Sequence, residues 1–184
     1  MKKIIALPFL LFLITCGNPQ PAEVSQPLVQ KSDSAVIAKT ESVAFVVKGI
    51  SISNINQFIH PEKGLWLIQS AGAMPSMVHT TQVDKNSPID FSKCMEDVLP
   101  KVDCNSKTLW TKEGCFIQQV NTFADEKLWS YCNLSKEDEA KVTELAKTVS
   151  YTVINTSFPA RYYFAQIDGK WYLVFADLRE PCSA

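Results

Sequence analysis

The pattern of apolar and polar residues is clearest near the end of the chain. Two apolar runs, residues 161–167 and 170–178, flank Asp168-Gly169, which favours a two-residue β-hairpin turn. In the register of such a turn, Phe164 faces Leu173 and Tyr162 faces Phe175. Both faces of the predicted hairpin are apolar, which indicates a central place in a sheet. Helices can cover one face, and the other needs a second cover or a ligand.

An amphipathic helix is predicted just before this hairpin. Ser135, with Asp138 three residues later, is typical of a capped helix start. An apolar stripe at helical spacing follows among charged side chains, and its members are Val142, Leu145, Ala146 and Val149. The stripe is narrow, so we expect this helix to cover one face of the hairpin.

The first elements of the folded part are also predicted from spacing. Apolar residues at helical intervals predict a helix over 34–48. Ser53 is expected to cap a short second helix. This helix should stop at His60, because a residue before proline avoids the helical conformation. The apolar run at residues 65–68 then predicts a short buried strand.

The middle of the chain has a weaker pattern. Short strands, a helical turn near 91–98 and long loops are all compatible with residues 69–106, which glycines and prolines interrupt. The runs 109–111 and 116–120 predict a hairpin around Glu113-Gly114, and residues 127–132 a further strand. Helices first, then a mostly antiparallel sheet, predict an α+β fold.

The N-terminal segment resembles the leader of bacterial lipoprotein precursors. Two lysines precede an apolar run, Ile4–Ile14, which is shorter than the roughly 20 residues that span a bilayer. The run ends in Leu13-Ile14-Thr15-Cys16, which resembles a lipobox. The resemblance implies cleavage before Cys16, a thioether-linked diacylglycerol on its sulfur and a fatty acyl group, such as palmitate, on its amino group. A plain secretory signal with an incidental cysteine is the alternative.

This leader predicts the organisation and the location of the protein. We expect a signal peptide at 1–15, a lipidated cysteine with a flexible Pro-rich tether at 16–34 and a single domain at 35–184. The protein is then anchored to a membrane of the bacterial cell envelope, with its domain outside the cytoplasm.

Charge narrows the range of partners. The whole chain has a net charge of −1, and loss of Lys2 and Lys3 with the leader changes this to −3. No basic run or basic–aromatic pattern occurs, so nucleic acid is not an expected partner. Attachment to the membrane then depends on the acyl groups, and the remaining partner is a small ligand or an envelope protein.

Five cysteines follow Cys16, and outside the cytoplasm they should be oxidised where geometry permits. An odd number leaves at least one outside intrachain pairs. Sixteen residues separate Cys115 from Cys132, so a hairpin turning near residue 123 predicts a disulfide between them. Proximity predicts Cys94 with Cys104, which leaves Cys182 free. No spacing indicates a metal site.

Signals for catalysis are few. The sequence has no nucleophile elbow, no phosphate-binding glycine loop and no zinc-protease motif, and it indicates no cofactor. His60 is the best candidate for a general base, and capping of a helix end is the competing interpretation. With Trp66, Tyr163 and Tyr172 it is a candidate to line a pocket for a sugar or apolar ligand. Core packing is the alternative for these aromatic residues.

Two short motifs support a second resemblance. Phe58-Ile59-His60-Pro61-Glu62-Lys63-Gly64 and Asp168-Gly169-Lys170-Trp171-Tyr172 resemble bacterial lipoproteins of the nuclear transport factor 2-like, cystatin-like group, over about residues 40–178. This resemblance implies a curved sheet wrapped on helices, with a concave pocket. Enzymes and binding modules both use that fold, so it does not select a function.

Three functions are therefore compatible with the sequence. The first is an envelope-anchored, non-enzymatic module that binds a ligand or another protein. The second is a small enzyme whose concave pocket holds His60 or an aspartate as general base. The third is a structural or assembly lipoprotein.

Overall fold

The computed structural model describes residues 43–70, 72–84, 89–120, 123 and 127–182, which belong to one compact unit. The predicted signal peptide, Cys16 and the tether lie outside the described residues. The same is true of residues 34–42 of the first predicted helix.

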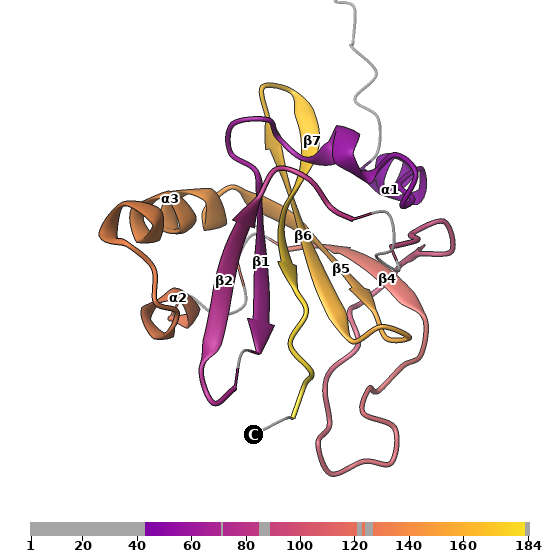
Figure 1. Cartoon of the computed structure of the whole chain (residues 1–184). Helices are drawn as coiled ribbons and strands as arrows, with labels where there is room; N and C mark the ends of the chain where they lie inside the picture. Colours follow the sequence, from indigo (N-terminus) through magenta and orange to yellow (C-terminus); the bar gives the residue numbers. More distant parts are fainter. Residues whose placement is uncertain (1–42, 71, 85–88, 121–122, 124–126, 183–184) are drawn as a thin grey trace, which may run out of the picture. The chain divides into compact units, whose positions relative to one another are not determined.

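The predicted closing hairpin is confirmed and lies in the middle of a sheet (Figure 1). Its strands are β6 (Ala160–Ile167) and β7 (Lys170–Asp177). The turn residues Asp168 and Gly169 have φ values of 51° and 78°, as a tight hairpin turn requires.

The register of this hairpin differs from the prediction in its outer half. Phe164 lies opposite Leu173 as predicted, but Tyr162 lies opposite Ala176 rather than Phe175. A bulge adds one residue to β7 between these pairs. Because side chains alternate along a strand, the extra residue moves Phe175 to the other face of the sheet.

Seven strands form one sheet in the described part of the chain. The other five are β1 (Leu65–Ser70), β2 (Pro75–Thr80), β3 (Met95–Glu96), β4 (Cys115–Gln119) and β5 (Val149–Asn155). Their spatial order is β2-β1-β7-β6-β5-β4-β3. β1 runs parallel to β7 and β3 parallel to β4, whereas the other neighbours are antiparallel. The sheet is therefore mixed, and β1 confirms the strand predicted at residues 65–68.

The predicted α+β fold, with helices packed on a curved cystatin-like sheet, is wrong. The described helices are short: α1 (Val43–Lys48), the 3-10 helix η1 (Ile55–Phe58), α2 (Leu128–Tyr131) and α3 (Lys136–Ala146). The sheet dominates, and loops share the covering of its faces with the helices (Figure 1). Apolar spacing identified helical segments, but not how little of the sheet they cover.

Local hydrogen bonds order the start of two of these helices. Ser135 caps α3 as predicted, since its hydroxyl accepts a hydrogen bond from the main-chain N–H of Asp138 at 3.1 Å. The predicted short helix before His60 is present as η1, but its N-cap residue is Asn54 rather than Ser53. The Asn54 side chain accepts a hydrogen bond from the N–H of Ser51 at 2.8 Å, which orders the turn before η1.

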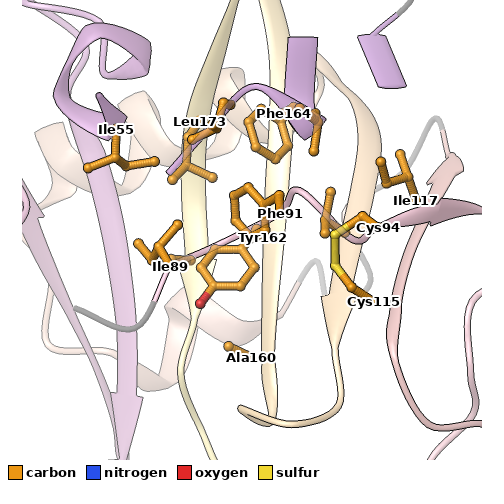
Figure 2. Packing of buried hydrophobic residues seen from close by; sticks show 14 of the residues in the cluster. Ile55, Ile89, Phe91, Cys94, Cys115, Ile117, Ala160, Tyr162, Phe164 and Leu173 are labelled. Atoms are coloured by element: carbon orange, nitrogen blue, oxygen red, sulfur yellow. A yellow bond between two sulfur atoms is a disulfide. The ribbon is translucent and has the colours of Figure 1, made fainter. Parts of the chain in front are cut away.

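Chain segments cover both faces of the central hairpin. One face, with Phe164 and Leu173, packs against α1, η1 and the loop that carries Phe91 (Figure 2). The rings of Phe91 and Tyr162 meet edge to face with their centroids 4.8 Å apart. The opposite face packs against α2 and α3, whose buried residues include Val142, Leu145 and Ala146. The second face of the hairpin, for which the sequence predicted a further cover or a ligand, is thus covered by other segments of the chain.

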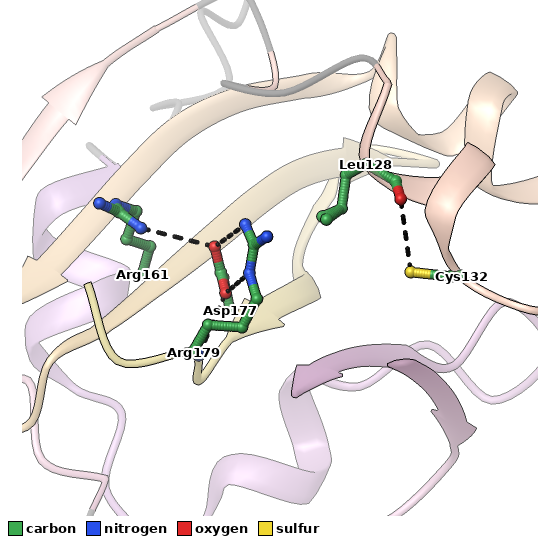
Figure 3. A network of polar contacts seen from close by, with 5 residues as sticks. All are labelled: Leu128, Cys132, Arg161, Asp177 and Arg179. Atoms are coloured by element: carbon green, nitrogen blue, oxygen red, sulfur yellow. Dashed lines mark hydrogen bonds and ion pairs between the residues drawn. The ribbon is translucent and has the colours of Figure 1, made fainter. Parts of the chain in front are cut away.

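The predictions for the middle of the chain are confirmed for some strands and wrong for others: short strands, one of the alternatives for residues 69–106, occur as β2 and β3, and the run 116–120 lies mostly in β4. Residues 109–120 form no hairpin, because β4 pairs with β3 and β5 while Trp110 bridges to Val102. Of the alternatives for residues 91–98, the structure has one hydrogen-bonded turn, from the N–H of Cys94 to the carbonyl oxygen of Phe91 at 3.0 Å, followed by the short strand β3 and not by a helix. Residues 127–132 form α2 in place of a strand, and the Cys132 sulfur lies 3.5 Å from the carbonyl oxygen of Leu128 one turn earlier (Figure 3).

The disulfides join Cys94 to Cys115 and Cys104 to Cys182. The predicted pairs Cys115–Cys132 and Cys94–Cys104 are therefore wrong, as is a free Cys182. The Cys115–Cys132 pair assumed a hairpin between these residues, whereas residues 128–131 form the helix α2 and not a strand paired with β4. Cys132 is buried and belongs to neither disulfide.

The buried carboxylate of Asp177 links the C-terminal segment, through Arg179, to the sheet, through Arg161 (Figure 3). The Asp177 side chain, 3% exposed, accepts hydrogen bonds from Nε and Nη2 of Arg179, each at 2.9 Å. It also pairs with Nη1 of Arg161 at 3.5 Å, and the Arg161 guanidinium lies 5.4 Å from the ring centroid of Trp110. This network links β6, β7, the C-terminal segment and the loop before β4.

Candidate functional site

A cleft of about 750 Å³ lies where α3 passes the start of β1 and the end of β2. Its lining includes the apolar side chains of Trp66, Leu145 and Ile167, and the polar or charged side chains of Glu62, Lys63, His79, Asp138, Lys141, Glu144, Thr148 and Gln166. Its volume falls in the usual range of small-ligand sites, about 300–1,000 Å³. We call these residues the α3 cleft.

Trp66 and His79 pack together at the sheet side of the α3 cleft. They lie opposite each other on β1 and β2, and their ring centroids are 4.8 Å apart. Trp66 is buried, whereas His79 is exposed. An aromatic pair with one exposed member offers a surface on which a ring or an apolar group can stack.

The His79 ring is held by the main chain. Its Nε2 lies 3.0 Å from the carbonyl oxygen of Lys63. Because a carbonyl oxygen only accepts hydrogen bonds, Nε2 carries the proton and donates it. In the neutral imidazole Nδ1 is then the acceptor nitrogen, able to bind a donor of a ligand or to take a proton.

A tight turn makes room for this ring. Gly64 has a φ of 63°, and its N–H donates to the carbonyl oxygen of His60 at 2.8 Å. A Cβ atom on Gly64 would overlap Nε2 of His79. Glycine at this position therefore satisfies both the backbone conformation and the space that the imidazole needs.

Charged side chains of α3 form the other side of the cleft. Hydrogen bonds from Ser135 and Lys141 lower the pKa of Asp138 below its ordinary value. Hydrogen bonds to Glu137 and Asp138 raise the pKa of Lys141. The cleft thus presents carboxylates, two ammonium groups and an imidazole around an apolar base.

Only one of the four predicted pocket residues lines this cleft. Trp66 does, whereas Tyr163 is buried in the core with its ring 4.5 Å from that of Phe123. His60 orders its own turn, since its Nδ1 accepts hydrogen bonds from the N–H groups of Glu62 and Lys63 at 3.1 and 3.2 Å. Tyr172 packs against His60, with ring centroids 4.9 Å apart.

The sequence interpretation missed His79 as a site residue. His79 falls within residues 69–106, where the weak pattern left short strands, a helical turn and long loops as alternatives. The pairing of β2 with β1 places His79 opposite Trp66, and residues 65–70 and 75–80 are both short uncharged runs around a glycine. Those paired runs were the available signal for a hairpin that brings the two rings together.

Comparisons of the chain with protein families, with curated sequences and with solved structures each gave no match. The resemblance to nuclear transport factor 2-like lipoproteins stays a prediction. Among the described residues, no group of three or more His, Cys, Asp or Glu side chains is placed to hold a metal ion. No helix in that part of the chain has the length and apolar character needed to cross a membrane.

Proposed function

We propose that this protein is a lipid-anchored protein of the bacterial cell envelope whose folded domain binds a small ligand in the α3 cleft. The observation that carries the proposal is the cleft itself, with Trp66 and His79 on one side and the charged face of α3 on the other. Clefts that combine an apolar base with a few polar groups are the usual form of ligand sites.

The sequence supports the anchor and the location. The short apolar leader ending in Leu13-Ile14-Thr15-Cys16 resembles a lipoprotein signal. The pairs Cys94–Cys115 and Cys104–Cys182 support a place outside the cytoplasm, because disulfides persist in oxidising compartments.

The chemistry of the lining favours a ligand with an apolar or ring-shaped part and several polar groups. The exposed His79 ring offers a stacking surface, while Glu144 and Lys63 offer an acceptor and a donor. Gln166 can do both. A sugar or a small zwitterion matches this combination better than a wholly apolar molecule does.

Mass spectrometry of protein gently extracted from its own membrane tests the ligand. We expect wild type to carry a bound small molecule, His79→Ala to lose it, and His60→Ala to keep it because His60 lies outside the cleft lining. Equal retention of the molecule by His79→Ala and wild type would place it elsewhere and contradict the proposal.

The anchor is tested separately by fatty-acid labelling in cells. Wild type should be labelled, and Cys16→Ala should remain unlabelled and either uncleaved or soluble. Equal labelling of the two proteins would contradict lipidation at Cys16.

A small enzyme is the second candidate, and the geometry of His79 favours it. The bond from Nε2 to Lys63 leaves Nδ1 as the acceptor, in a cleft that also contains Asp138. In this reading the general base is His79 rather than His60, whose Nδ1 is already used by two main-chain N–H groups. Turnover of a bound molecule that His79→Ala abolishes and His60→Ala retains would select the enzyme.

A further inference from the structure

A second cavity, of about 500 Å³, lies on the other face of the sheet from the α3 cleft. On β1, Leu65 and Leu67 line this cavity, whereas Trp66 between them lines the α3 cleft. Because successive side chains of a strand point to opposite faces, the two spaces are separated by the sheet. The neighbouring strands β6 and β7 contribute Tyr162 and Ala176 to the lining. We call this space the Tyr162 cavity.

The Tyr162 cavity is too large to be a defect of core packing. Protein interiors are close-packed, with few voids larger than a water molecule. A volume of about 500 Å³ instead falls in the range of small-ligand sites. Phe158 and Leu178, which also line the cavity, are 45% and 41% exposed, so apolar side chains lead from solvent into it. Exposed apolar groups beside a cavity are typical of binding grooves.

The Tyr162 hydroxyl borders this cavity without a hydrogen-bond partner. Tyr162 is 3% exposed, its ring packs against Phe91, and Figure 2 shows its hydroxyl pointing away from Phe91 and Phe164. In the described part of the chain no group hydrogen-bonds this oxygen, and burial alone raises the pKa of Tyr162 to about 12. The phenol is therefore neutral and can donate to an acceptor in the cavity. Buried polar groups normally have a partner, so this hydroxyl indicates a place for one.

The rest of the lining indicates an acceptor without charge. No Lys, Arg or His occurs among the described residues that border the cavity, so an anionic group would meet no opposite charge there. Asp84 and Glu180 also border it, and their carboxylates disfavour a further negative charge. Apart from these two residues, Gln69, Gln82 and Tyr162, the described lining is apolar. A neutral oxygen on an apolar molecule suits these surroundings.

We propose that the Tyr162 cavity binds an uncharged, mostly apolar small molecule whose carbonyl, ester or hydroxyl oxygen accepts a hydrogen bond from Tyr162. The apolar part of this molecule lies against Leu65 and Leu67, and Phe158 and Leu178 cover it from the solvent side. The site has no described lining residue in common with the α3 cleft, so it is a second site that does not depend on the first. It does not depend on the lipid anchor either.

Photolabelling of the full chain in its own membrane with benzophenone tests the proposal. Benzophenone is an uncharged, apolar ketone. On irradiation its oxygen takes the hydrogen atom of a nearby C–H bond, and the two carbon radicals then join. We expect saturable labelling, which peptide mass spectrometry maps to cavity residues such as Leu67, Ile89 or Leu178.

A matched pair of competitors tests the charge of the ligand. Decanol should displace benzophenone from the cavity. Decanoate, a chain of the same length that ends in a carboxylate, should need a concentration about tenfold higher or more, because burial of an unpaired charge is costly. Equal displacement by the two molecules would contradict a site for uncharged ligands.

Variants of the chain test the hydrogen bond and the location. Tyr162→Phe removes only an unpartnered oxygen, so it should fold and should need about fivefold more benzophenone for half-maximal labelling, the effect of one neutral hydrogen bond. Leu178→Gln should also weaken labelling, whereas Val98→Gln, at a site 59% exposed and outside both cavities, should not. His79→Ala should label like wild type, because His79 belongs to the α3 cleft.

Three results would overturn the proposal. The first is labelling confined to residues outside the Tyr162 cavity. The second is an equal half-saturating concentration for Tyr162→Phe and wild type, or for Leu178→Gln and Val98→Gln. The third is loss of labelling in His79→Ala, which would place benzophenone in the α3 cleft. Failure of the α3 cleft to bind a ligand would leave all of these measurements unchanged.

Discussion

Gly64 lies so close to the His79 ring that only glycine, which has no Cβ atom, fits at position 64. A Cβ atom on Gly64 would overlap the Nε2 atom of His79 and would stand 2.8 Å from the main-chain oxygen of Thr80. The turn after His60 and the imidazole of the α3 cleft are therefore coupled through the missing side chain.

We expect Gly64→Ala to change both stability and the cleft. A non-glycine residue at positive φ costs about 1–2 kcal/mol, and the overlap adds displacement of His79 from the Lys63 carbonyl. Gly169→Ala is the matched control, because Gly169 has a φ of 78° but nothing within 4 Å of its Cβ position. Denaturant unfolding should show the larger loss for Gly64→Ala. An equal loss in the two variants would show that the overlap has no cost.

The two disulfides should differ in how readily they are reduced. Cys104 and Cys182 are exposed, whereas Cys94 and Cys115 are 2% and 8% exposed. Under mild reductant, peptide mapping should show loss of the Cys104–Cys182 bond first. Any native bridge that includes Cys132 would contradict the pairing.

Removal of the Cys104–Cys182 disulfide should still lower the free energy of unfolding substantially. Cys104 and Cys182 are 78 residues apart, and the chain-entropy relation gives a stabilisation of about 4–5 kcal/mol for a loop of this size. The double variant Cys104→Ser/Cys182→Ser should lower the unfolding free energy by an amount of this order, measured by denaturant titration. An unchanged unfolding free energy would indicate that the bond constrains little of the unfolded chain.

Because Tyr162 is buried with a neutral phenol, we expect the free energy of unfolding to fall at alkaline pH. Burial raises the pKa of Tyr162 from its usual value of 10.0 to about 12. The unfolded chain therefore releases this proton first, so the stability from the neutral phenol is fully present below pH 10 and is lost as the pH rises toward 12. The loss amounts to about 2–3 kcal/mol. In Tyr162→Phe, rapid unfolding measurements should show a smaller decline over this interval, and an identical decline would contradict the assignment.

Among the charged residues of the described part, Asp177 should lower the free energy of unfolding most when it is substituted, because it is buried between two arginines. Asp177→Asn leaves two arginines beside an uncharged, buried amide, and loss of one partner in such a network costs about 3 kcal/mol. Asp97→Asn is the control, because the Asp97–Lys112 pair is largely exposed and should affect the unfolding free energy little. Similar melting temperatures for the two variants would contradict the role of the buried network.

Core truncations test the central place of the hairpin. Leu173→Ala and Phe164→Ala remove fully buried side chains that lie opposite each other, and each should cost about 2–5 kcal/mol. Glu144→Ala, on the exposed side of α3, should change the unfolding free energy by less than about 0.5 kcal/mol. Thermal melting of Leu173→Ala together with wild type would show that the hairpin is peripheral.

The sequence by itself determined the elements whose signals are local. Asp168-Gly169 determines a tight turn through its positive φ angles, and Ser135 determines the start of α3 through a hydrogen bond three residues away. The apolar character of both faces of the closing hairpin also predicted its central place. Each of these features depends on residues close together in the chain.

Only the tertiary structure decided which distant residues meet. The bulge opposite Phe164 moves Phe175 across the sheet, and no local signal marks it. The parallel pairing of β3 with β4 brings Cys94 beside Cys115, and the β1–β2 hairpin brings Trp66 beside His79. These contacts depend on strand register over long separations. A register shift of one residue exchanges the two faces of a strand, so local apolar spacing alone does not select among the alternatives.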